Sequence, residues 1–132
     1  MKAPSRVLAL SLALWAIAPG AASQPRPSAV LTVRQSLGVS PAAARREAQR
    51  HGPAVRACME AAWRRDAAAM GALRLVIATV RLRAGGDAEV VALDPPLRTR
   101  GLSQCLAEAL LGWQQPGPVR PRAWVELTLA LR

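Results

Sequence analysis

The sequence predicts an α+β domain in which two helices pack on one face of a small antiparallel sheet, in the order helix-strand-strand-helix-strand. Three observations lead to this fold class. Two segments repeat apolar residues at helical spacing, and three segments alternate apolar and polar residues as strands do. A Gly-Gly-Asp turn joins the first two of these strands, which makes them antiparallel neighbours.

The chain has 132 residues, 52% of them hydrophobic, and a formal net charge of +10. This length corresponds to one small domain and excludes enzymes built from separate cofactor and substrate domains. The apolar content is too high for a disordered basic tail. The sequence therefore describes a single folded unit.

The N-terminal 23 residues have the features of a cleaved signal peptide. Lys2 and Arg6 make a positive start, residues 7–18 are apolar and uncharged, and residues 21–23 fit the small-residue cleavage pattern. A transmembrane anchor is the alternative, but it needs about 20 apolar residues, more than this run supplies. We therefore expect a periplasmic or secreted protein.

The sequence divides into three regions. The signal peptide at residues 1–23 precedes a linker rich in Pro, Ser and Arg at residues 24–39, and the folded domain is expected at residues 40–132. Within the linker, only residues 29–33 have the composition of a short strand.

The first helix is predicted to begin at Ser40-Pro41, an N-cap residue followed by proline at the first helical position. One face of the segment that follows is apolar at three- and four-residue steps: Ala44, Ala48, His51, Val55, Cys58, Met59 and Ala62. Pro53 has no amide hydrogen to give to the carbonyl of Gln49, so Gly52-Pro53 predicts a kink or a restart of the helix.

After the first helix the apolar period changes to two residues. Apolar residues alternate as far as Ile77 and then, from Val80 on, alternate with the opposite parity, which predicts a β-bulge near residues 78–79. The turn signal at residues 85–87 leads into a second strand at residues 88–93.

The second helix and the last strand complete the domain. Thr99 is the best N-cap candidate for the helix, whose apolar face consists of Leu102, Cys105, Leu106, Ala109, Leu110 and Trp113. A proline-rich turn at residues 116–118 ends it. The last strand alternates cleanly, with one apolar face: Val125, Leu127, Leu129 and Leu131.

Several residues in this order resemble a known domain family. They are Ser40, His51, Val55-Arg56-Ala57-Cys58, Gly71, Gly85, Cys105 and Trp113-Gln114-Gln115-Pro116-Gly117-Pro118. The pattern is similar to the AgmX/PglI C-terminal domain family, a TonB-like domain of myxobacterial gliding-motility and envelope proteins, and extends over residues 37–131. Met59 and Gln115 stand where the family usually has aromatic residues, and the last strand lacks its Tyr-Pro-Phe. The resemblance implies a TonB-like fold and an envelope-associated role in motility or transport machinery.

Cys58 and Cys105 are predicted on the apolar faces of the two helices. A disulfide between them fits an exported protein and the paired cysteines of the similar family. By the chain-entropy relation it would stabilise the fold by about 4 kcal/mol. Two buried free thiols are one alternative, and a metal or redox pair is another, although a zinc site needs about four ligands and a redox motif needs closer spacing.

No catalytic constellation, cofactor or metal is expected from the sequence. His51 and Cys58 share a helix face, as a thiol nucleophile and its base would, but two helical turns separate them. A histidine in helix–sheet packing is the simpler interpretation. The acidic residues are scattered, and Ser103 has no identifiable His or Asp partners. We therefore expect a protein that is not an enzyme.

The arginines of the first helix suggest a basic face, made of Arg45, Arg46, Arg56 and Arg64, with Arg50 and Arg65 nearby. Such a face fits a peripheral contact with anionic envelope lipid or polysaccharide. Nucleic acid is not an expected partner, because no aromatic residues alternate with these arginines and an exported protein seldom meets it.

The favoured function is a non-enzymatic envelope adaptor. We expect the last strand at or near a sheet edge, where it would pair with an extended segment of an unknown envelope protein. The residues expected to make this contact are Trp124, Val125, Glu126, Leu127 and Thr128. The alternatives are a small exported hydrolase or thiol enzyme, and an accessory domain that binds a second copy of itself. The sequence leaves monomer and homodimer open.

Overall fold

The computed structural model describes residues 29–97, 99 and 101–131. The predicted signal peptide and the first residues of the predicted linker lie outside this range. The predicted α+β class is confirmed, because the described residues form a four-stranded antiparallel sheet and three helices. In chain order they are β1 (Ala29–Leu37), α1 (Pro41–Arg65), α2 (Ala67–Ala72), β2 (Leu75–Leu82), β3 (Ala88–Asp94), α3 (Leu102–Leu111) and β4 (Trp124–Leu131).

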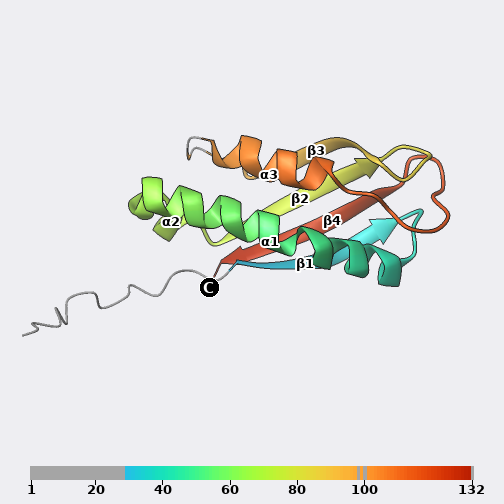
Figure 1. Ribbon diagram of the computed structural model, residues 1–132, viewed down its shortest axis with the longest axis horizontal. Helices are drawn as coiled ribbons and strands as arrows, with labels where there is room; N and C mark the ends of the chain where they lie inside the picture. The colour runs from blue at the N-terminus through green and yellow to red at the C-terminus, as the bar shows by residue number, and fades with distance from the viewer. Residues whose placement is uncertain (1–28, 98, 100, 132) are drawn as a thin grey trace, which may run out of the picture.

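The strands lie in the order β1-β4-β2-β3, so β4 is in the interior of the sheet. β1 pairs with one side of β4 and β2 with the other, while the β2–β3 hairpin extends the sheet beyond β2. α1 and α3 cover the same face of the sheet, and α2 continues from the end of α1 (Figure 1). None of the helices in the described part of the chain lies on the opposite face (Figure 1).

The predicted domain boundary at residue 40 is wrong, because the short strand considered at residues 29–33 is present and extends to residue 37 as β1. This strand pairs with all of β4, from Ala29 opposite Leu131 to Leu37 opposite Trp124. The longer strand forms because Leu31 and Val33 pack against the core under α1, and a bulge at Arg34 lets the polar second half continue the pairing. The folded domain therefore begins before residue 40.

The bulge predicted in β2 near residues 78–79 is also wrong. Val76, Ala78, Val80 and Leu82 are buried with a single parity, and β2 pairs with β4 without interruption. The sequence suggests a slip because Ile77 is apolar although it lies on the opposite face of the sheet. A register shift does occur in the hairpin, where Glu89 of β3 is the extra residue.

One of the two predicted helix N-caps is confirmed. Ser40 caps α1 through its hydroxyl, which accepts from the amide of Ala43 at 3.4 Å, and α1 continues through Pro53 without a restart. α3 does not use Thr99 as its N-cap. It begins after Gly101, whose φ of 78° is the left-handed conformation that favours glycine.

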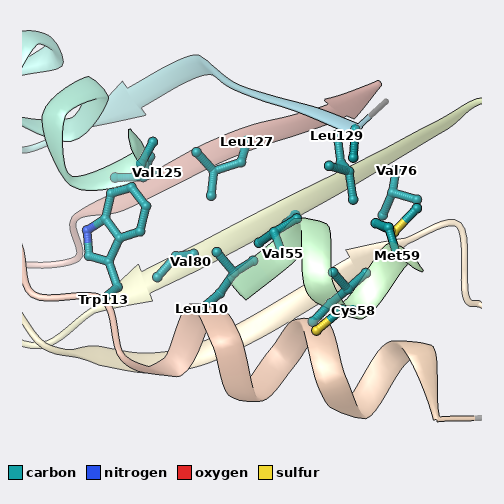
Figure 2. Close-up of a cluster of buried hydrophobic side chains, with 14 of the residues drawn as sticks. Val55, Cys58, Met59, Val76, Val80, Leu110, Trp113, Val125, Leu127 and Leu129 are labelled. Carbon is teal, nitrogen blue, oxygen red and sulfur yellow. The ribbon is translucent and has the colours of Figure 1, made fainter. Parts of the chain in front are cut away.

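The hydrophobic core lies between the helices and the covered face of the sheet (Figure 2). Val55, Cys58 and Met59 of α1 and Leu110 of α3 meet the inward residues of the three strands β2, β4 and β1. Trp113, just after α3, is the largest side chain with less than 2% exposure and closes the core beside Val80 and Val125. One face of every strand therefore packs against this core.

Candidate binding surfaces

The residues predicted to bind a partner at a strand edge do not lie at an edge. Trp124, Val125, Glu126, Leu127 and Thr128 belong to β4, whose two sides are occupied by β1 and β2. Strand addition to β4 is therefore excluded. The prediction is wrong because β1, which pairs with the outer side of β4, has the composition of a linker over much of its length.

The alternate residues of β4 nevertheless reach solvent on the face without helices. Val125 and Leu127 point into the core, whereas Trp124, Glu126 and Thr128 are half-buried on the opposite side. We call this side the open face. Its residues are Val30, Thr32, Gln35 and Leu37 of β1, Trp124, Glu126, Thr128 and Ala130 of β4, Leu75, Ile77, Thr79 and Arg81 of β2, and Val90, Ala92 and Asp94 of β3.

Large apolar side chains lie at both ends of the open face. Within the described part of the chain five large hydrophobic residues are exposed, and four of them lie there: Val30 (40%), Leu37 (55%), Leu75 (43%) and Val90 (44%). The register places Val30 and Leu75 in one row at one end, and Leu37 and Val90 in one row at the other. The fifth is Leu111 on α3, which is 47% exposed. Singly scattered apolar residues need no explanation, but several on one face are consistent with an interaction surface.

Polar groups on the open face largely satisfy one another. The Glu126 carboxylate accepts a hydrogen bond from the Gln35 amide and lies 3.7 Å from the Arg34 guanidinium. Thr32 and Thr128 face each other across β1 and β4, with their hydroxyl oxygens 3.4 Å apart. The centre of this face therefore has little net charge on a chain that carries +10 overall.

The two edges of the sheet are β1 and β3, each with one neighbouring strand. The first residues of β3 are partly covered, because the Ala88 amide donates to the Trp113 carbonyl and Asp87 forms a bridge with Gln114. Beyond that point, residues 90–94 have no second strand among the described residues.

The predicted disulfide between Cys58 and Cys105 is present in the structure. It joins α1 to α3 within the helix layer and closes a sequence separation of 47 residues. Cys58 is only 3% exposed. The disulfide takes up the thiol that a Cys58–His51 catalytic pair would have required.

The sequence does not predict the buried polar cluster that Glu47 and His51 form with the Gln114 amide. Glu47 is 2% exposed, and its carboxylate accepts hydrogen bonds from the backbone amide of Gln114 and from His51, both at 2.9 Å. His51 also lies 3.0 Å from the Ala109 carbonyl and stacks on Trp113, with ring centroids 5.4 Å apart. Helical spacing could have paired Glu47 with His51, but no local signal points to Gln114, 67 residues away.

Burial alone would raise the pKa of Glu47, because a charged carboxylate loses its hydration. The hydrogen bonds from Gln114 and His51, together with the positive charge of Arg50, outweigh that cost and hold the pKa below its ordinary value of 4.5. Glu47 therefore remains ionised at neutral pH. Its role here is structural, because it fastens α1 to the segment after α3.

The predicted basic face is exposed along α1. Arg45, Arg46, Arg56 and Arg64 reach solvent, and none forms an ion pair within the described part of the chain. Arg50, beside them, binds Glu47 at 3.1 Å. These positions present positive charge on the outer side of the helix layer, away from the open face.

No helix in the described part of the chain has both the length and the apolar character to cross a membrane. The same residues contain no group of three or more His, Cys, Asp or Glu side chains placed to hold a metal ion. Ser103 donates to the Leu97 carbonyl at 3.4 Å rather than to a histidine.

Comparison with known proteins gives no relatives. No family model, curated protein or solved structure matches this chain.

Proposed function

We propose that this protein is a non-enzymatic, exported interaction domain of the cell envelope, and that it binds a partner protein through the open face of its sheet. One observation carries the proposal: four of the five large exposed apolar side chains in the described part of the chain lie on that face. Removing apolar surface from water is favourable, and this is the main driving force of most protein–protein association.

The charges of this face define the chemistry of the partner. Glu126 is matched by Gln35 and Arg34, and Thr32 by Thr128, so docking would bury few unpaired polar groups at the centre. A partner surface that is apolar and uncharged fits this pattern. A strongly acidic partner would instead be drawn to the exposed arginines, which lie on α1 and, as Arg81 and Arg122, at one end of the open face.

Export is the second part of the proposal. Disulfides persist in oxidising compartments, so the Cys58–Cys105 bridge and the predicted signal peptide support a periplasmic or secreted location. A role in motility or transport machinery rests on the family resemblance of the sequence. Strand addition is a secondary mode, and in this sheet it would use β3 at residues 90–94 or β1, not β4.

The test compares two leucines of nearly equal exposure. Leu75→Glu places a charge on the open face, and Leu111→Glu places the same charge on α3, outside it. We expect Leu75→Glu to abolish recovery of the partner from crosslinked envelopes and Leu111→Glu to leave it unchanged.

Thermal unfolding of both variants serves as the folding control, because neither side chain belongs to the core. Equal recovery of the partner by the two folded variants would show that the open face is not the binding surface.

A further inference from the structure

A hollow of about 670 Å³ lies at one end of the open face, next to the last residues of β1 and β2 and the first residue of β4. Figure 1 shows that these three strand ends lie at the same end of the sheet. Its volume is within the usual range of small-ligand sites, about 300–1,000 Å³. We call it the arginine basin. It is lined by Leu37, Arg81, Leu82, Arg83, Ala84, Glu89, Pro121, Arg122, Ala123 and Trp124.

The basin is positively charged. Arg81 and Arg122 are exposed and form no ion pair with any described residue, whereas Arg83 is held by Asp87 at 2.8 Å. Glu89 is the one acidic side chain in the lining. Two guanidinium groups are therefore free to bind an anion, and guanidinium groups bind carboxylates and phosphates through paired hydrogen bonds.

The turn that carries Arg122 is fastened on both sides. The Arg120 amide donates to the Gly38 carbonyl and the Leu82 amide to the Ala123 carbonyl, each at 2.9 Å. Gly38 has a φ of 77°, and a Cβ there would stand 3.0 Å from that of Ala123, so β1 and the turn approach closely. Arg122 is thus held by its neighbours rather than on a loose loop.

Arg122 also has a backbone conformation that non-glycine residues seldom adopt. Its φ is 60°, in the left-handed region. Such a conformation is strained and occurs preferentially at sites that bind or react. Arg122 adopts it at the wall of the arginine basin.

Trp124 supplies an apolar wall beside the arginines. A sugar ring has C–H groups on one face that suit an indole, while its hydroxyls need acceptors such as the Glu89 carboxylate. An acidic group on the sugar would meet Arg81 and Arg122. A polyphosphate, by contrast, would bring several negative charges toward Glu89.

We propose that the arginine basin binds an acidic saccharide, with the sugar ring against Trp124 and its carboxylate or phosphate on Arg81 and Arg122. This site does not depend on the partner surface proposed above, because a small saccharide can bind without any protein partner.

The experiment is an NMR titration of the purified protein with three probes: galacturonic acid oligomers, a hexose phosphate and a neutral gluco-oligosaccharide. We expect shifts at the Trp124 indole with the acidic probes only. Arg122→Gln and Arg81→Gln should each weaken binding by about tenfold, the loss expected for one charge-assisted contact. The stronger of the two acidic probes identifies the group as a carboxylate or a phosphate.

Arg56→Gln, on the outer side of α1, removes the same charge outside the basin and should leave the affinity unchanged. Two results would overturn the proposal: equal binding of the neutral saccharide, or equal weakening by Arg56→Gln. Absence of shifts up to high probe concentration would overturn it as well.

Discussion

Glu47 joins parts of the molecule that are far apart in the chain. It stands in α1, it binds His51 one turn later, and it receives the backbone amide of Gln114 beyond α3. An apolar residue in its place would leave the partly buried Gln114 amide and His51 without this acceptor, which would destabilise the protein.

Replacing Glu47 with alanine should lower the free energy of unfolding by about 3 kcal/mol, because the Gln114 amide and His51 both lose their acceptor. Chemical denaturation at pH 7 measures this loss. Glu60→Ala is the matched control, since Glu60 is an exposed carboxylate of the same helix, and a loss as large in that variant would contradict the assignment.

Acid should destabilise the protein through the same residue. The pKa of Glu47 is lower in the folded protein than its ordinary value of 4.5. A lowered pKa means that its stabilising contribution is complete above about pH 4.5 and disappears as the pH falls through the folded pKa. Glu47→Gln should flatten the decline in stability between about pH 5 and pH 3. Asp87→Asn should flatten it less, because the hydrogen bond from Arg83 also lowers the pKa of Asp87 but this ion pair is exposed to solvent. An unchanged decline in Glu47→Gln would refute this reasoning.

At the scale of elements, the disulfide and β1 complete a core that the remaining elements would leave small. The bridge joins the two long helices above the sheet, and β1 covers the outer side of β4. Domains of this size bury only about 60–70% of their unfolded surface, so each such addition matters.

Reduction of the disulfide should lower the free energy of unfolding by about 4 kcal/mol, the loop-closure value for a separation of 47 residues. Denaturation of the Cys58→Ala, Cys105→Ala double variant measures the same quantity without a reductant. A thiol titration of the unfolded, unreduced protein that found two free thiols would contradict the bridge.

Removing β1 tests the domain boundary. A chain that begins at residue 40 lacks the pairing partner of β4 and exposes Leu127 and Leu129 at a new edge. We expect it to be unfolded or aggregated, and a chain that begins at residue 24 to fold. Circular dichroism and size-exclusion chromatography distinguish the two. A cooperative thermal transition in the shorter chain would show that residues 40–132 fold without β1, which would contradict this boundary.

The sequence predicts those elements whose signals are local. The N-cap at Ser40, the hairpin and the alternation of β4 are each contained in a few neighbouring residues, and all are found. The full length of β1 could not be predicted, because its second half contains the polar residues Arg34, Gln35 and Ser36. This half is a strand because it pairs with β4. The position of β4 and the Glu47–Gln114 contact depend on segments distant in sequence, which periodicity does not report.

For the whole molecule, the central property is the contrast between two sides. The helix layer carries the disulfide and the basic face, while the open face has apolar side chains at its ends and a centre with little net charge. A molecule with this distribution can dock a partner over the centre of the open face, with the arginines of α1 on the other side and Arg81 and Arg122 at one end. The net charge also aids solubility.

Photo-crosslinking in living cells tests this arrangement most directly. Thr79 is half-buried at the middle of the open face, and Ala57 is exposed on the outer side of α1. With a photoreactive residue at either position, we predict one discrete protein adduct from position 79 and none from position 57, and loss of that adduct when Leu75 is changed to Glu. No adduct from position 79, the same adduct from both positions, or an adduct with twice the mass of this chain would contradict the proposed partner surface.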